Sequence, residues 1–146
     1  MPENDMLVLQ DLRKTFNPGT VMRKMALAGV DLTLRKGDFI TVIGGNGAGK
    51  STMLNAIAGT FQINNGKILL GGRDVTHLPE HRRAAFLGRV FQDPMTGTAA
   101  TMQIEENLAL AARRGQRRTL RIGITREERE EYREKLATWV WGWKTA

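Results

Sequence analysis

A glycine-rich loop at residues 44–51 constrains what this chain can fold into more than any other feature. The loop matches the pattern G-x-x-x-x-G-K-[ST] and follows an apolar, β-branched run at residues 39–43. That run predicts a short strand buried on both faces. After the loop, Ser51 to Ala58 carries apolar residues at helical spacing, and Gly59 is the expected C-cap. This pattern binds phosphate when a strand precedes the loop and a helix follows it.

The residues of the loop suit the phosphates of a nucleoside triphosphate. Glycines let successive N–H groups point inward without a Cβ clash, and with the helix N-terminus these groups form a nest for anions. Lys50 adds a mobile positive charge for the β- and γ-phosphates, and Ser51 offers a hydroxyl to Mg²⁺. We therefore expect a triphosphate site formed by Gly44, Gly45, Asn46, Gly47, Ala48, Gly49, Lys50, Ser51 and Thr52.

Up to residue 96 the remaining pattern predicts an α/β region. A strand at residues 7–12 continues towards Phe16, and residues 26–34 alternate with period two. In that second strand the even-numbered residues from 28 to 34 are expected to form the apolar face, with Leu27 on the opposite face. Further strands are expected at residues 66–70 and 87–91, and a short helix at residues 79–84.

Beyond residue 96 the pattern becomes helical. Helices are expected at residues 104–112 and 125–137. Thr125 with Glu128 three residues later is typical of a capping box at the start of the second helix. The sequence therefore predicts an α/β region followed by a helical one.

The composition narrows the class of protein. The net charge is +7, and between residues 113 and 135 nine basic residues accompany five acidic ones. This surplus is typical of a solvated helical surface, and the other interpretation is a basic face for anionic lipid or nucleic acid. The chain has no cysteine, which fits a reducing cytoplasm, and no apolar run long enough to span a membrane.

Several segments resemble the ATP-binding subunits of ABC transporters, in the same order and spacing. The sequence GGNGAGKST at residues 44–52, with Leu54 and Gly59 downstream, is similar to the phosphate loop of that family. Residues 90–94, VFQDP, resemble its Q-loop. The other similar segments are residues 12–16, 28–32, 36–38 and 101–108.

The resemblance implies an α/β fold of the ABC type of P-loop NTPase, in incomplete form. Residues 1–96 would hold the antiparallel β lead-in and part of the core sheet, and residues 97–138 the start of the helical subdomain. It implies ATP and Mg²⁺ as cofactors, and membrane-spanning transporter subunits and a second ATP-binding subunit as partners. It also implies a cytoplasmic location on the inner face of the cell membrane, with no nucleic acid bound.

Two residues outside the loop take roles from this resemblance. Phe16 would be the aromatic residue that stacks on adenine, although a core phenylalanine in a strand is an equal alternative. Gln92 would contact Mg²⁺ or the attacking water, as a weak catalytic candidate, and would face the membrane subunit.

Sequences that the family uses for hydrolysis do not occur in this chain. No Leu-Ser-Gly-Gly-Gln type signature is present, and no apolar run followed by Asp and a catalytic Glu follows the loop. The switch histidine and the dimerisation loop are also absent. The resemblance thus implies an ATPase, whereas the chain by itself is expected to bind nucleotide without turning it over.

All three tryptophans lie in the last eight residues, 139–146. At this place the family commonly has Leu-Gly-Leu-Gly-Leu-Glu-Asn, and one possible codon string for the tail encodes that heptapeptide when shifted by one base. We therefore expect a non-native, frameshifted tail, and a genuine tail with buried tryptophans is the alternative. An incomplete core sheet would give low solubility or a molten state.

Two other functional classes remain open from the sequence. One is a non-catalytic nucleotide-binding module that regulates or competes with full-length subunits. The other is a different P-loop NTPase, such as a GTPase or a small-molecule kinase. A GTPase is disfavoured because no Asn-Lys dipeptide, which begins the guanine-recognition sequence, occurs in the chain.

Overall fold

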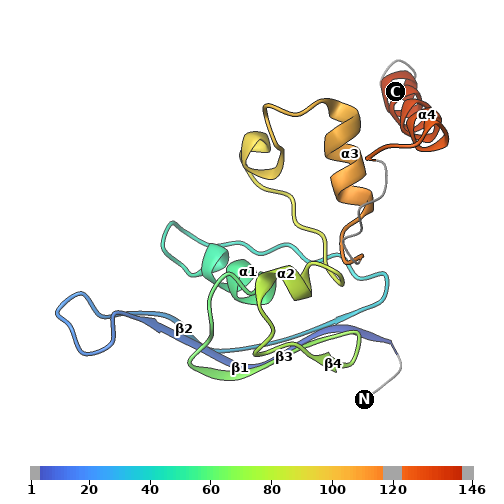
Figure 1. Ribbon diagram of the computed structural model, residues 1–146. Helices are drawn as coiled ribbons and strands as arrows, with labels where there is room; N and C mark the ends of the chain where they lie inside the picture. The colour runs from blue at the N-terminus through green and yellow to red at the C-terminus, as the bar shows by residue number, and fades with distance from the viewer. Residues whose placement is uncertain (1–3, 117–122, 143–146) are drawn as a thin grey trace. The chain divides into compact units, whose positions relative to one another are not determined.

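The structure is a computed structural model that describes residues 4–116 and 123–142 (Figure 1). The chain divides into two compact units between Gly88 and Arg89, and each unit is described by itself. The division into functional regions expected at residue 96 stays a prediction.

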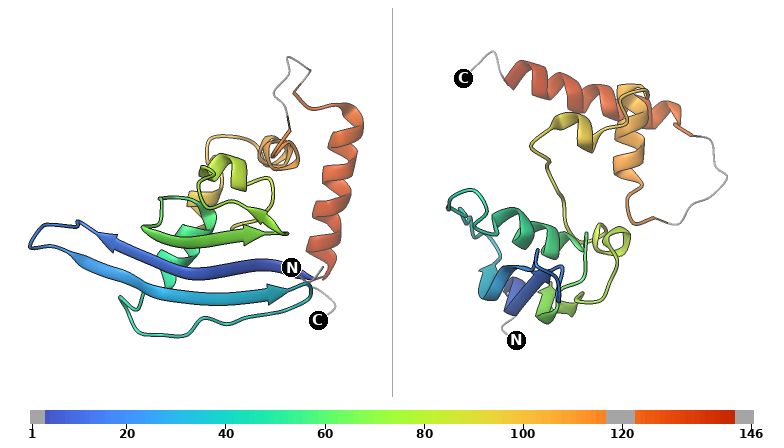
Figure 2. Two further views of the ribbon diagram at one scale, coloured as in Figure 1. Left: turned by 90° about the horizontal axis from the view of Figure 1, so that it is seen from below. Right: turned by 90° about the vertical axis from the view of Figure 1, so that its left-hand side faces the viewer.

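In the described part of the chain, four strands form one antiparallel sheet in the order β2-β1-β3-β4 (Figures 1 and 2). The strands are β1 (Asp5–Phe16), β2 (Lys24–Arg35), β3 (Asn65–Leu70) and β4 (Arg73–Asp74). The strands predicted at residues 7–12, 26–34 and 66–70 are thereby confirmed. Since β1 lies between β2 and β3, both of its edges are hydrogen-bonded.

A bulge at Gly29 corrects the predicted faces of β2. Leu12 pairs with Val30 and Arg13 with Ala28, so Gly29 is the extra residue, with a φ of 101°. A bulge shifts the alternation of faces by one residue. Leu27 is therefore buried in the core, the half-buried Val30 packs against that core, and Ala28 is exposed. The expectation that Leu27 lies opposite the apolar face was wrong.

Two helices cover one face of the sheet, α1 (Lys50–Ala58) and α2 (Glu80–Arg83) (Figures 1 and 2). Helix α1 ends at the predicted Gly59, whose N–H donates to Asn55 O at 3.0 Å. The core between helix and sheet consists of Leu9, Leu12, Leu27, Met53, Ala56, Ile68 and Val75. This packing fixes α1, and with it the loop at its N-terminus, on the sheet.

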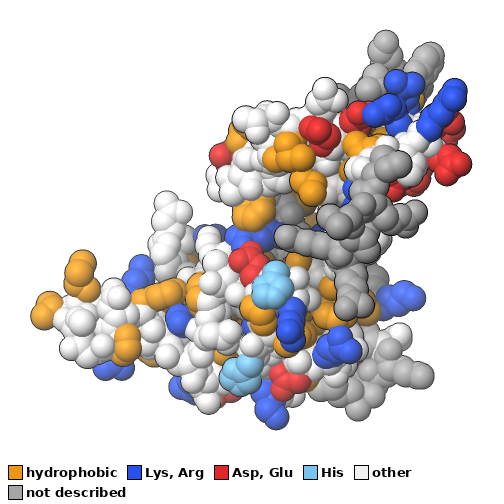
Figure 3. Space-filling view, viewed as in Figure 1, with side chains coloured by type: hydrophobic (Ala, Val, Ile, Leu, Met, Phe, Trp, Pro, Cys, Tyr) orange, Lys and Arg blue, Asp and Glu red, His pale blue; other side chains and the backbone are white. Residues whose placement is uncertain are grey.

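Two predicted strands are not strands in the structure. Residues 39–43 and 87–91 are outside any strand, and Phe39 is 93 % exposed, Ile43 89 % and Val90 97 %. Figure 3 shows hydrophobic side chains at the surface of the molecule. Apolar runs of this kind become strands when neighbouring strands pair with them. Among the described residues no strand pairs with either run, which is the physical reason for the difference.

The second unit contains a short 3₁₀ helix η1 (Pro94–Gly97) and two helices, α3 (Ile104–Ala112) and α4 (Arg126–Gly142). Both predicted helices are confirmed, and α4 continues beyond residue 137. A capping box that the sequence reasoning missed begins α3, where Gln103 N donates to Glu106 Oε2 at 2.7 Å. The side chains of residues 139–142 and all of residues 143–146 lie outside the description, so the frameshifted tail stays a prediction.

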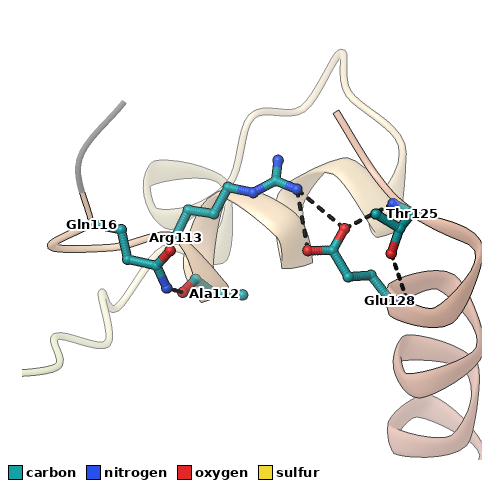
Figure 4. Close-up of polar contacts among 5 residues, drawn as sticks. All are labelled: Ala112, Arg113, Gln116, Thr125 and Glu128. Carbon is teal, nitrogen blue, oxygen red and sulfur yellow. Dashed lines mark hydrogen bonds and ion pairs between the residues drawn. The ribbon is translucent and has the colours of Figure 1, made fainter. Parts of the chain in front are cut away.

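The capping box predicted at the start of α4 is confirmed (Figure 4). Thr125 N donates to Glu128 Oε2 at 2.8 Å, and Glu128 N donates to Thr125 Oγ1 at 3.2 Å. Arg113, just after α3, adds an ion pair to Glu128 at 3.2 Å. The Thr125 N–H and this guanidinium hold the pKa of Glu128 below its ordinary value. Further pairs of basic and acidic side chains in this unit join Arg126 to Glu130, Arg129 to Glu105, and Lys135 to Glu131.

Candidate nucleotide-binding site

Gly49 determines the backbone conformation of the glycine-rich loop. This residue has a φ of 87°, and a Cβ on it would lie 2.6 Å from Ala26 O in β2. Only glycine avoids both the left-handed strain and the clash. Gly49 is also the N-cap of α1, and Met53 N donates to its carbonyl at 2.8 Å. The loop is therefore held close to β2 at the point where α1 begins.

The N-terminus of α1 is suited to an anion. The first N–H groups of a helix have no partners within the helix, and the helix dipole places partial positive charge there. Gly49 has no side chain to cap these groups, and the first turn, Lys50–Met53, contains no acidic residue. Ser51 is exposed and Thr52 is half-buried in this turn, so both hydroxyl-bearing residues accompany the free N–H groups.

The ammonium of Lys50 lies over the beginning of the loop. Its Nζ donates to Gly44 O at 2.5 Å and to Gly45 O at 2.9 Å. Ala48 N in turn donates to Gly45 O at 3.2 Å, which closes the loop into a turn. The predicted loop residues are thus brought together in one compact structure with a positive charge on it.

A buried arginine that the sequence reasoning missed anchors the other end of α1. Arg83 is only 1 % exposed, and its guanidinium donates to four backbone carbonyl groups. The distances to Ala56 O and Ile57 O at the end of α1 are 2.7 and 3.0 Å. The distances to Thr76 O and Leu78 O are 2.9 and 2.8 Å.

A positive charge at the C-terminus of a helix is favourable because the dipole is negative there. Burial lowers the pKa of Arg83, and the charge of Asp74 opposes that shift. Arg83 therefore joins α1 to the segment after β4. Its residue type and position carry no sequence signal that distinguishes it from the exposed Arg82 next to it.

Phe16, the candidate adenine-stacking residue, lies half-buried at the end of β1. Its ring meets that of Phe61 edge to face, with the centroids 5.3 Å apart and an angle of 79°. Lys14 Nζ lies 5.2 Å from the Phe16 centroid and 4.9 Å from that of Phe61. The same Nζ donates to Gln62 O at 2.6 Å. Phe61, which the sequence reasoning missed, thus orients the Phe16 ring.

Gln92 is exposed and lies in the second unit, whereas the loop lies in the first. The next residue, Asp93, caps η1 by accepting a hydrogen bond from Met95 N at 2.9 Å. The role of Gln92 therefore stays a prediction. In residues 4–116 and 123–142 no group of three His, Cys, Asp or Glu side chains could hold a metal ion. No helix in the same ranges is long and apolar enough to cross a membrane.

Comparison with known proteins decides the family. The family model described as ABC transporter matches residues 27–144, which is more than half of the chain. The chain belongs to the ABC transporter family. The matched residues include the glycine-rich loop, α1 and the helices of the second unit.

Curated relatives of this ABC chain agree with the family match. The tyrosine transport ATP-binding protein of Clostridioides difficile (strain R20291) is 37 % identical over 115 residues, covering 75 % of this chain and 44 % of the relative. The lipoprotein-releasing system ATP-binding protein LolD 1 of Rhodopseudomonas palustris is 39 % identical over 92 residues, covering 60 % of this chain and 41 % of the relative. The chain thus spans less than half the length of these relatives.

Solved structures show the same fold. The dimeric bacterial ABC transporter cassette MJ0796 superposes with a TM-score of 0.71 at 26 % identity, covering 88 % of this chain and 55 % of that one. A nucleotide-free ATP-binding cassette from an ABC transporter gives a TM-score of 0.62 at 28 % identity, covering 80 % and 44 %. The mixed α/β fold of the ABC type, expected from the sequence, is confirmed.

Proposed function

We propose that this chain binds ATP through residues 44–52, as part of the ATP-binding subunit of an ABC transporter. The observation that carries the proposal is the glycine loop at the N-terminus of α1, with the Lys50 ammonium on the loop carbonyls. A lysine held by two carbonyl oxygens can exchange them for phosphate oxygens with little movement. The relatives named as ATP-binding proteins support this assignment.

The loop fits the triphosphate because it combines free N–H groups, a flexible cation and two hydroxyl-bearing residues. The N–H groups would hold the phosphates, Lys50 would neutralise the β- and γ-phosphates, and Ser51 would offer its hydroxyl to Mg²⁺. When bound, Mg²⁺ supplies charge neutralisation on the phosphate oxygens. We assign the adenine to the Phe16 ring and leave Gln92 as the second candidate for Mg²⁺.

The whole transporter's activity is proposed from the relatives. In an intact subunit, ATP binding and hydrolysis would drive transport through membrane-spanning subunits, with a second ATP-binding subunit alongside, at the inner face of the membrane. MJ0796, which is titled as a dimer, supports the second subunit. The basic and acidic side chains that pair across the second unit favour a solvated surface over a nucleic-acid site.

A binding measurement tests the proposal. Isothermal titration calorimetry with ATP and Mg²⁺ should give one saturable site per chain. Lys50→Ala should weaken this binding by at least about tenfold, because charge-assisted hydrogen bonds to phosphate contribute about 1.5–3 kcal/mol. The exposed Lys67, in β3 of the same unit, provides the control variant Lys67→Ala, which should bind as the wild type does. A folded chain without saturable binding would contradict the proposal.

A second candidate function is nucleotide binding without hydrolysis, in a regulator or competitor of full-length subunits. Phosphate release from bound ATP, measured with a coupled assay, separates the two. ATP binding without release favours this second candidate, and steady release by the isolated chain contradicts it.

A further inference from the structure

The first residues of β2 run directly beside the glycine loop. A Cβ on Gly49 would lie 2.6 Å from Ala26 O, and a Cβ on Gly47 would lie 3.8 Å from Lys24 Nζ. The two contacts are two residues apart in both segments, so the start of β2 follows the loop from Gly49 to its tip at Gly47.

Lys24 therefore brings a second ammonium group to the loop. Lys50 Nζ lies on the carbonyls of Gly44 and Gly45, whereas Lys24 Nζ lies beside Gly47. Within the part of the chain that the structure describes, the Lys24 ammonium has no hydrogen-bond or ion-pair partner. An exposed cation with no acidic partner, next to a nest of N–H groups, adds to the attraction for an anion.

Lys24 also lies between the two parts of the proposed nucleotide site. It is the cross-strand partner of Phe16 in the β1–β2 ladder, and directly opposed residues in such a ladder are about 5 Å apart. A nucleotide with its base on Phe16 and its phosphates in the loop would pass over Lys24.

We propose that Lys24 is a further phosphate-binding residue, whose ammonium contacts the phosphate chain of the bound nucleotide beside Gly47. The inference rests on the proposed function, because it requires a triphosphate in the loop. It assigns to Lys24 a contribution to affinity that is electrostatic and independent of the fold, since its side chain is exposed.

The test compares charge-removing variants of two exposed lysines on the same unit. Lys24→Met removes the proposed contact, and Lys36→Met, in the turn after β2, removes an equal charge at the other end of the strand. Lys24→Arg retains the charge. Affinity for ATP with Mg²⁺ is measured by calorimetry at low and at high salt, and circular dichroism checks the fold of each variant.

We expect Lys24→Met to weaken ATP binding about fivefold at low salt, which corresponds to one exposed ion pair. It should also reduce the salt dependence of the affinity, because one screened interaction is removed. Lys24→Arg should restore most of the affinity, and Lys36→Met should bind as the wild type does. Lys24→Gln, as a second neutral variant, should repeat the result of Lys24→Met.

Three outcomes would overturn the inference. Equal affinities and salt dependences for Lys24→Met and Lys36→Met would show that Lys24 makes no specific contact. ATP binding that is lost in Lys50→Ala but unchanged in both neutral Lys24 variants would overturn this inference and leave the proposed function standing. A folded wild-type chain without ATP binding would overturn both.

Discussion

Strand β1 and residues 39–43 are both rich in apolar side chains and belong to the same unit, yet their environments are opposite. In β1, Leu9 is 1 % exposed and Leu12 is fully buried, with β2 on one edge and β3 on the other. In residues 39–43, Phe39 is 93 % exposed and Ile43 is 89 % exposed. Burial in this molecule therefore follows from the strand partners that are available, rather than from local composition.

The two regions are also expected to affect different properties, one the stability of the chain and the other its solubility. The antiparallel sheet with α1 forms a core of its own, which holds the glycine loop in place. An extended apolar segment with unpaired N–H and C=O groups is, in contrast, a template for pairing with other chains. We expect the first region to determine the free energy of unfolding and the second to determine self-association.

The largest expected effect comes from truncating the core of β1. Leu12→Ala should lower the free energy of unfolding by about 3 kcal/mol, through the lost burial and the cavity that remains. Ile43→Ala should change it by less than about 0.5 kcal/mol, because that side chain is already exposed. Urea unfolding at low protein concentration measures both. Similar losses for the two variants would contradict the comparison.

Arg83 tests whether the core depends on the attachment of α1. Arg83→Met should lower the free energy of unfolding by about 2 kcal/mol, because it leaves buried carbonyl groups without a donor. The neighbouring Arg82 is exposed, so Arg82→Met is the matched control and should have little effect. If the two methionine variants unfold at the same urea concentration, the anchoring role of Arg83 is wrong.

These residues also show what the sequence could and could not predict. Periodicity and capping residues that lie close in the chain predict the strands of the sheet, helix α1 with its C-cap Gly59, and the capping box at Thr125. The buried Arg83 depends on carbonyl groups from distant turns, and the reversed face of Leu27 depends on one bulged residue. The run at residues 39–43 has the composition of a strand, but pairing depends on neighbours that local sequence does not reveal.

Substitutions in the exposed run, residues 39–43, should have a smaller effect on stability but a measurable effect on self-association. Ile43→Lys should leave the free energy of unfolding within about 0.5 kcal/mol of the wild-type value, since it changes a surface side chain. The added charge should disfavour pairing between chains and raise the monomer fraction. Analytical ultracentrifugation measures this fraction. An unchanged fraction would mean that residues 39–43 are not the surface through which the chain associates.

The smallest expected effect is on the helix content of the second unit at low pH. The pKa of Glu128 is lowered in the folded state by the Thr125 N–H and by Arg113. Its stabilising contribution is thus present above the ordinary carboxyl pKa of about 4.3 and is lost as the pH falls through the lowered value. Helix content by circular dichroism should decline less on acidification in Glu128→Gln than in the wild type. Glu127→Gln, at the exposed neighbouring position, should behave as the wild type does.

The central claim is that the phosphates of ATP bind in the loop at residues 44–52. Hydrogen–deuterium exchange of the backbone amides, with and without ATP and Mg²⁺, tests it directly because those amides are the proposed ligands. The account predicts slower exchange across this loop and the first turn of α1, and less slowing in Lys50→Ala at the same ATP concentration. Bound ATP that leaves exchange in this loop unchanged would contradict the account.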